Sequence, residues 1–301
     1  MNQKEINIAI VANMSAGKST FINAMFGDDI LPSSSQATTD CPIYIYSDDK
    51  PNSNIAVIEF SDNKDTKVLN NESVKKDLKK YAKKDSLVDD DKYKAVEKID
   101  LYWQFYRLIN KKSNNDYFVI IDTPGPNNRD EYGEKHNSIT KNIILNEADM
   151  LLYIFDYTQI DANLEVTQNN IWGWIEKRKK INKKFDVYFI INKIDKALDD
   201  NNKLPAVVNS KTEEEYLLNL QTNWFYHEQK AINKIKLMAE KIGFNSSCVF
   251  VTSSEYQKLN RMKKLSFKDK KKLCAFQEIF QEVFKDDWTN KFNEYIELSW
   301  I

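Results

Sequence analysis

The segment Ala12–Ser19 (ANMSAGKS) places hydroxyl, glycine and lysine residues between two strongly patterned stretches. The β-branched run before it, Ile6–Val11, predicts a buried strand, and the apolar spacing after Lys18 predicts a helix. Backbone N–H groups at the start of such a helix form a concave site for anions. In this arrangement the Lys18 ammonium reaches the β- and γ-phosphates of a nucleotide, and the Ser19 hydroxyl is a ligand of Mg²⁺. Ala12 replaces the usual first glycine of the pattern, and a methyl group is the smallest possible departure.

A second motif, Asp122-Thr123-Pro124-Gly125, ends another apolar run. Its spacing suits a carboxylate that holds Mg²⁺ through water and a glycine amide that senses the γ-phosphate. As an isolated tetrapeptide it is also an ordinary turn sequence, because proline and glycine form turns.

A third motif, Asn192-Lys193-Ile194-Asp195, follows the buried run Val187–Ile191. The Asp195 carboxylate can accept hydrogen bonds from both N1–H and the exocyclic amine of guanine. Adenine lacks this pair of donors and would leave a buried carboxylate unpaired, which disfavours an ATP-using enzyme. The segment Val251–Ser254 lies where a backbone contact to the base is expected, although alone it is a weak signal. Three motifs in this order, each at the carboxyl end of a predicted strand, indicate a site for GTP and GDP.

Composition narrows the other possibilities. The 301 residues are 42% hydrophobic and 30% charged with a formal net charge of −1, so a nucleic-acid partner is not expected. Three scattered cysteines without metal-ligand spacing favour a reduced, cytoplasmic compartment. The first strand begins so early that we expect no cleavable signal peptide. No apolar run approaches the roughly 18 residues of a membrane span, so any membrane contact is expected to be peripheral.

Strand and helix patterns alternate along most of the chain, which predicts an α/β fold: a three-layer P-loop GTPase domain with a mostly parallel central sheet. Besides the first strand, strands are predicted at 42–46, 55–60, 99–106, 117–121, 150–155, 185–191 and 248–252, and helices near 134–147, 163–179, 213–241 and 270–297. The strands at 99–106 and 117–121 are expected to pair with each other across the polar loop 110–115.

Two regions stand apart from this alternation. Residues 62–98 are highly charged and predict a helical insertion, with short helical patterns at Val74–Ala82 and Tyr93–Val96. Its lysines are a candidate face for lipid headgroups or a partner, although aspartates dilute the charge. The last helical stretch carries an apolar stripe that must pack on the domain's own surface or on a partner helix. We therefore divide the chain into a GTPase domain at 1–260 and a C-terminal helical segment at 261–301.

Beyond the general nucleotide pattern, the sequence resembles the dynamin-like GTPases, particularly their bacterial branch. Ser15-Ala16-Gly17-Lys18-Ser19-Thr20 is similar to the phosphate loop of that family. Leu31-Pro32 and Thr39-Asp40-Cys41-Pro42 reproduce its spacing around the first switch. The likeness covers roughly residues 5 to 260.

The resemblance implies roles for individual residues. Thr39 would ligate Mg²⁺ and help to orient the attacking water, and Ser15 would line the phosphates and contact a monovalent cation. Met14 departs from the family, which has glutamine at this position, and a thioether cannot make the hydrogen bonds that position water. Either Thr39 and backbone groups orient the water, or a partner supplies the missing group.

The predicted site thus has three overlapping sets of residues. The predicted catalytic residues are Lys18, Thr39 and Ser15, and the predicted metal ligands are Ser19, Thr39 and Asp122. The predicted nucleotide-binding residues are Asn13, Met14, Ser15, Ala16, Gly17, Lys18, Ser19, Thr20, Gly125, Asn192, Lys193, Asp195, Ser253 and Ser254.

By resemblance, nucleotide-dependent homodimerisation through the GTPase domain would complete the site, and a larger membrane-associated assembly would be the output. Dynamin-like proteins carry a long helical stalk after this domain, and the residues that follow Ser254 are too few to form one. Either the chain is the GTPase part of a longer protein, with a stalk partner or stalk segment elsewhere, or it is a compact relative. The alternative function is a slow, GTP-controlled interaction switch that depends on a partner for activation.

Overall fold

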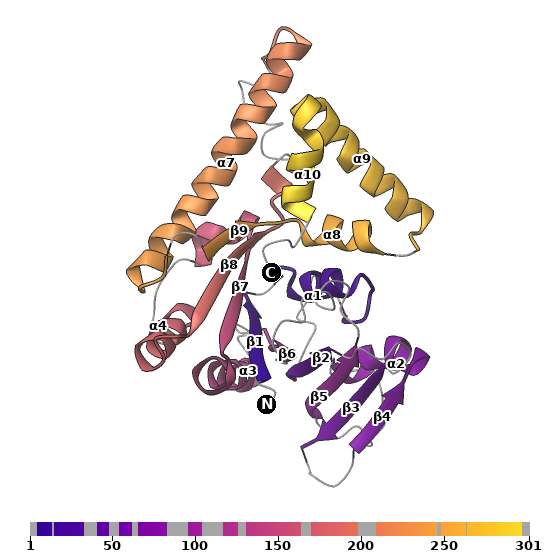
Figure 1. Cartoon of the computed structure of the whole chain (residues 1–301), viewed down its shortest axis with the longest axis vertical. Helices are drawn as coiled ribbons and strands as arrows, with labels where there is room; N and C mark the ends of the chain where they lie inside the picture. The colour runs from indigo at the N-terminus through magenta and orange to yellow at the C-terminus, as the bar shows by residue number, and fades with distance from the viewer. Residues whose placement is uncertain are drawn as a thin grey trace.

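The structure is a computed structural model of the chain. It describes residues 5–13, 15–32, 41–47, 54–61, 66–82, 96–103, 117–125, 131–163, 170–197, 209–245, 248–262 and 264–296. Figure 1 shows a twisted sheet flanked by helices, with a group of helices standing at one end of it.

The described strands form a single nine-stranded sheet. They are β1 (Glu5–Ala12), β2 (Ile43–Ser47), β3 (Ile55–Phe60), β4 (Thr66–Asn70), β5 (Val96–Trp103), β6 (Tyr117–Asp122), β7 (Met150–Asp156), β8 (Asp186–Asn192) and β9 (Val249–Val251). Their order is β4-β3-β5-β2-β6-β1-β7-β8-β9. Five of the strand pairs are parallel, and the pairs β2–β6, β3–β4 and β3–β5 are antiparallel. The prediction of a mostly parallel sheet is confirmed.

Helices cover both faces of this sheet. The helices in the described part of the chain are α1 (Lys18–Phe26), α2 (Glu72–Ala82), α3 (Glu131–Asn142, continued by a π-helical turn at Ile143–Glu147), α4 (Ile171–Ile181), α7 (Glu213–Lys241), α8 (Ser254–Arg261), α9 (Phe267–Phe284) and α10 (Trp288–Ile296), with short 3-10 helices at Tyr157–Asn163 and Lys285–Asp287.

Alternate residues of the central strand β1 face opposite layers, and this alternation explains the three-layer packing. Ile10 packs with Phe21 of α1 in a core that also includes α2. Val11 packs with Trp172 of α4 and Ile235 of α7 in the core on the other face, which includes the turn after α3. β1 is buried on both sides, as expected for the centre of a parallel sheet. The predicted three-layer α/β architecture is confirmed.

The charged insertion differs from the prediction in one respect. Helix α2 matches the first helical pattern, but β4 precedes it and pairs antiparallel with β3, so the insertion is not only helical. The helix predicted at Tyr93–Val96 is wrong at Val96, because this residue begins strand β5. Residues 93–95 lie outside the described residues. β4 escapes prediction because its sequence, TKVLN, buries only Leu69 and gains its order from pairing with β3.

The expected pairing of the strands at 99–106 and 117–121 is also wrong. Both segments form strands, β5 and β6, but β2 lies between them, parallel to β5 and antiparallel to β6. Ile43 of β2, for example, is opposite Ile99 of β5 on one side and Asp122 of β6 on the other. β2 takes this place although it is distant in sequence, because it forms backbone hydrogen bonds with the facing edges of both β5 and β6.

The C-terminal stretch forms two helices rather than one. α9 ends at Lys285, which adopts a left-handed φ of 46°, and α10 packs back against α9 (Figure 1). The predicted apolar stripe is buried within the chain: Phe280 and Phe292 join Trp224 of α7 in a third core. Within the described residues, none of the helices is long and apolar enough to span a membrane.

Candidate functional site

The loop between β1 and α1 has the conformation of an anion site. β1 ends at Ala12, between β6 and β7, and α1 begins at Lys18. Gly17 and Ser15 have left-handed φ angles of 84° and 65°, which bend the chain sharply into the helix. Gly17 is the N-cap residue and has no side chain to accept from the first N–H groups of α1. A helix start without a side-chain cap is a typical site for an anion.

A buried ion pair joins the first motif to the second. The Lys18 ammonium donates to Oδ1 of Asp122, whose carboxylate is fully buried at the end of β6. The following residue, Thr123, donates its hydroxyl to the Ile10 carbonyl at 2.9 Å, which fixes the turn against β1. The structure thus places a lysine and a carboxylate together at the start of α1, as a phosphate and metal site requires.

The third motif is hydrogen-bonded to the phosphate loop. The Asn192 amide donates to the Ala16 carbonyl at 2.8 Å and accepts from the backbone N–H of Ser254 at 2.9 Å. Lys193, in a left-handed conformation with φ of 61°, donates to the Ser15 carbonyl at 2.6 Å. These bonds hold three segments, which are far apart in sequence, at one edge of the sheet.

Asp195 is half-buried and faces the loop that follows β9. The Ser253 hydroxyl donates to its Oδ1 at 2.6 Å. Burial raises the pKa of the Asp195 carboxyl, and the hydrogen bond from Ser253 opposes that rise. The structure therefore places the Asp195 carboxylate beside Ser253, at the start of α8.

The remaining predicted residues are distributed around this centre. Asn13 accepts from the Tyr153 hydroxyl at 3.4 Å, Thr20 lies in the first turn of α1, and Gly125 follows β6. A Cβ on Gly125 would have no neighbour within 4 Å among the described residues. Met14 and Thr39 lie outside the described residues, and their roles stay predictions.

Sequence reasoning missed Asp156 at the end of β7. This 2%-exposed carboxylate accepts from Lys193 at 2.7 Å and from the backbone and hydroxyl of Thr158 at 2.9 and 2.7 Å. It orients Lys193 and compensates its charge. Its position at the carboxyl end of a parallel strand, next to β1, is the signal that could have identified it.

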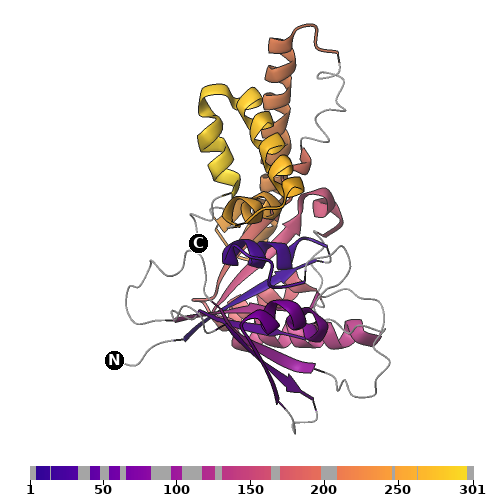
Figure 2. The same cartoon turned by 90° about the vertical axis from the view of Figure 1, so that its right-hand side faces the viewer.

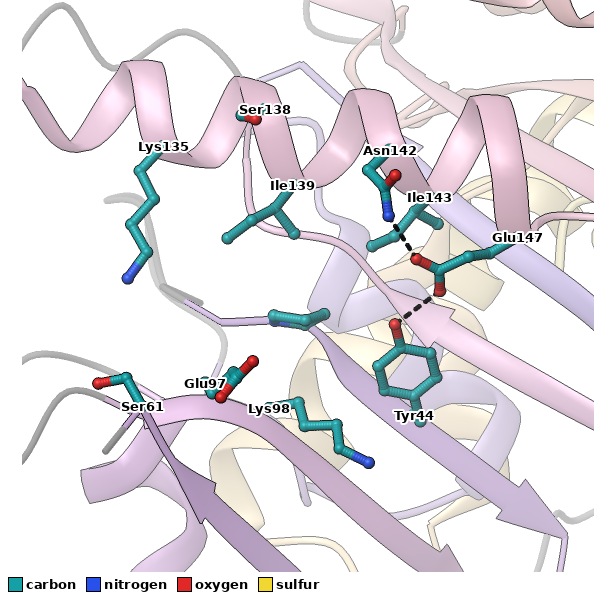
Figure 3. Close-up of a pocket in the computed structure, with 11 residues that line it drawn as sticks. Tyr44, Ser61, Glu97, Lys98, Lys135, Ser138, Ile139, Asn142, Ile143 and Glu147 are labelled. Atoms are coloured by element: carbon teal, nitrogen blue, oxygen red, sulfur yellow. Dashed lines mark hydrogen bonds between the residues drawn. The ribbon is translucent and has the colours of Figure 1, made fainter. Parts of the chain in front are cut away.

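A separate hollow of about 470 Å³ lies between α3 and the strands β2 and β5. Figure 3 shows the Tyr44 hydroxyl and the Asn142 amide converging on the Glu147 carboxylate, each at 2.7 Å. The predicted nucleotide-binding residues do not line this hollow. Most of its lining residues come from β2, β5, α3 and the π-helical turn that follows α3.

The model of the Dynamin family matches residues 8–194. A sequence comparison with curated proteins gives no match. Among solved structures, the chain is similar to a protein of an oligomerised bacterial dynamin pair that senses and tethers membranes, with 17% identity, 96% of this chain and 39% of that chain covered, and a TM-score of 0.47. It is also similar to a variant of Era from Aquifex aeolicus bound to GDP and AlF4⁻ (16% identity, 84% and 52% covered, TM-score 0.39). A third similar structure is a dimerisation-deficient mutant of Toc33 from Arabidopsis thaliana, with 12% identity, 83% of this chain and 71% of that chain covered, and a TM-score of 0.39. The chain spans about half the length of the Era structure.

Proposed function

The chain belongs to the dynamin family of GTP-hydrolysing enzymes, and on that premise we propose that the edge of the sheet around Lys18, Asp122 and Asp195 binds GTP with Mg²⁺ and cleaves it to GDP and phosphate. The observation that carries the assignment is the Asn192 amide, which bonds to both the phosphate loop and the loop after β9. One side chain would thereby fix the distance between the proposed triphosphate site and the proposed base site.

The residues around the phosphate loop suit a triphosphate with its metal. The first N–H groups of α1 would hold phosphate oxygens, and Lys18 would leave Asp122 for the β- and γ-phosphates. Ser19 and Asp122 would then hold Mg²⁺, Asp122 through water, and the Gly125 amide would contact the γ-phosphate. When bound, Mg²⁺ would neutralise negative charge on the phosphate oxygens. Hydrolysis of this type depends mainly on positioning and charge, which these residues provide.

The base would be read by the other two segments. On binding, Asp195 would exchange the Ser253 hydroxyl for the two donors of guanine, and Lys193 would line the base while bonded to Asp156. Ser253 and Ser254 offer backbone groups at the start of α8. A guanine therefore finds acceptors that an adenine cannot use.

Asp195→Asn tests the base assignment. Asparagine keeps an acceptor but adds donors, which match the 2-carbonyl that xanthine carries in place of guanine's amine. We expect the variant to lose GTP binding and to gain binding of xanthosine triphosphate, measured by calorimetry. An unchanged preference for GTP would overturn the assignment. Lys18→Ala is the companion variant, because it should weaken both nucleotides.

Turnover is the second part of the proposal. We infer that Thr39 and Ser15 act at the γ-phosphate, Ser15 with a monovalent cation, and that GTP-dependent homodimerisation completes the site. Membrane-associated assembly of a cytoplasmic chain would follow, with residues 261–301 as the C-terminal helical segment. Sedimentation with GDP, GTP and a transition-state mimic measures the pairing. A chain that stays monomeric with the mimic would contradict it.

Met14 favours a second candidate, a slow GTP-controlled switch. Its thioether cannot orient water as an amide does, so a partner would have to supply that group. Single-turnover hydrolysis separates the two functions: phosphate release by the purified dimer supports the enzyme, whereas tight binding without release supports the switch.

A further inference from the structure

The last helix of the described chain bonds directly to the loop that follows β9. The main-chain carbonyl of Tyr295 accepts from the Thr252 hydroxyl at 2.9 Å, the Ser253 backbone N–H at 3.2 Å and the Gln257 amide at 3.4 Å. Tyr295 lies in the last turn of α10, where helix carbonyls have no partner within the helix. All of these groups are buried, so the bonds are shielded from water.

The side chain of the same residue fixes α10 to α7. The Tyr295 hydroxyl accepts from the indole N–H of Trp224 at 2.9 Å and donates to the Glu228 carboxylate. We call the N-terminal half of α7 together with α9 and α10 the helical unit. Figures 1 and 2 show it standing at one end of the sheet. Tyr295 therefore bonds the helical unit with its side chain and the 252–254 loop with its backbone.

The Asp195 segment packs on the same unit. Ile194 and Ala197, which flank Asp195, are both fully buried in the core formed by Trp224 and Phe280. Both segments predicted to touch the base thus rest on the helical unit.

A third contact reaches α1. The Arg261 guanidinium donates to the Ala24 carbonyl of α1 at 3.0 Å and to the Ile296 carbonyl of α10 at 3.4 Å. Arg261 is 7% exposed, so the bridge is internal. This contact is at the far end of α1 from the phosphate loop, whereas the Tyr295 contacts are next to Asp195. The helical unit is therefore coupled more directly to the base than to the phosphates.

We propose that Tyr295 is a positioning residue for guanine recognition, and that binding of the base, but not of the phosphates alone, is coupled to the packing of the helical unit. The inference rests on the proposed function, because it takes Asp195 and the 252–254 loop as the base site. Coupling is reciprocal: a base that orders the loop strengthens the docking of α10, and a displaced α10 weakens the base site. A partner that pulls on the helical unit would thus promote release of the nucleotide.

Hydrogen exchange on the full chain tests the coupling. We expect GDP to slow exchange at both the phosphate loop and residues 288–296. Inorganic tripolyphosphate, a probe of the phosphate site alone, should slow exchange only at the phosphate loop. Protection of the phosphate loop by GDP with no change in α10, or equal protection of α10 by both ligands, would overturn the coupling alone. No protection anywhere by GDP would overturn the proposed function and this inference with it.

Substitutions at Thr252 test the contact with the Tyr295 carbonyl. Thr252→Val removes the hydroxyl that donates to Tyr295 at nearly constant shape, and we expect GDP binding to weaken about fivefold, as for one buried hydrogen bond. Binding of tripolyphosphate should not change, and Thr252→Ser, which keeps the hydroxyl, should restore the affinity. Equal weakening for both ligands would indicate a merely structural role and would reject the inference.

Tyr295→Phe cuts the link to α7 but keeps the backbone bonds to the 252–254 loop, so it is expected to reduce the GDP-induced protection of α10 without abolishing it. Because it leaves Trp224 and Glu228 without their buried partner, its folding must be checked by thermal melting. Tyr226→Phe is the matched control: it makes the same change on an exposed tyrosine of α7 and should leave binding and protection as in the wild type. If Tyr295→Phe does not fold, the Thr252 pair decides the question.

Discussion

A Cβ on Gly17 would lie 2.5 Å from Nδ2 of Asn192, closer than a side-chain carbon can approach. The phosphate loop and the base motif are therefore in direct contact, although 175 positions separate them in the sequence. Because the same Asn192 amide donates to Ala16, any group on residue 17 would push it out of its bridging position.

Gly17→Ala should therefore abolish GTP binding. The methyl group displaces Asn192. The strain of an alanine at this left-handed φ also lowers the free energy of unfolding by about 1 to 2 kcal/mol. Calorimetry measures the binding and urea titration the stability.

Gly243→Ala is the matched control for this variant. Gly243 has the same φ of 84°, but within the described part of the chain its Cβ would have no neighbour within 4 Å. It should show the strain without the loss of binding. Loss of binding in both variants, or in neither, would argue against the contact with Asn192.

Lys18→Ala should destabilise the protein by about 3 kcal/mol, because it leaves the Asp122 carboxylate buried without its cation. If Asp122 helps to hold Mg²⁺, then Mg²⁺ alone should raise the melting temperature of this variant more than that of the wild type. In Lys18→Ala combined with Asp122→Asn, the response to Mg²⁺ should vanish. A persistent response would place the metal elsewhere.

GDP affinity should fall on acidification, beginning at a higher pH than for an ordinary aspartate. Burial raises the pKa of Asp195, and its protonated form can no longer accept both hydrogen bonds from guanine. Affinity is thus full above that pKa and is lost as the pH falls through it.

Ser253→Ala should change the pH dependence of GDP affinity relative to the wild type. The Ser253 hydroxyl lowers the pKa of Asp195, so its removal should move the loss of affinity to a higher pH. Calorimetric titrations run from about pH 8 down to about pH 4, the ordinary aspartate pKa, so that any upward shift lies within the range. A midpoint unmoved by the substitution would contradict the assigned role of this hydrogen bond.

Glu228 should make the helical unit less stable as the pH rises. Burial raises the pKa of its carboxyl, so the folded chain holds the proton more tightly than the unfolded chain does. The stabilisation is present at acidic pH and is lost as the pH rises through the raised pKa. Glu228→Gln keeps an acceptor for Tyr295 without the charge. It should unfold at a higher urea concentration than the wild type above that pKa, and equal midpoints at every pH would refute the prediction.

Much of the fold is predictable from local patterns. Strand β3 and helix α7 have the predicted bounds, because their side-chain periodicity is a local property of the chain. The phosphate loop is equally local: Gly17 is needed for its conformation, and Lys18 begins the helix at once. The three motifs were recognisable because each follows a strand, and parallel strands bring their carboxyl ends to one edge.

Other features had no local signal. Position 285 is a lysine rather than a glycine or proline, so nothing in the sequence marked the end of α9 there. β2 was recognisable as a strand, but its place between β5 and β6 depends on partners far along the chain.

By itself, then, the sequence predicted which residues carry the chemistry, because their types and spacing are typical of phosphate, metal and guanine ligands. Only the tertiary structure decided what holds them. Two hydrogen bonds illustrate this: Lys193 donates to Asp156, and Thr252 donates to the Tyr295 carbonyl. Each joins segments that only folding brings together. Such contacts have no sequence pattern, since their energy arises from burial and hydrogen bonding across the finished core rather than from any local preference of the chain.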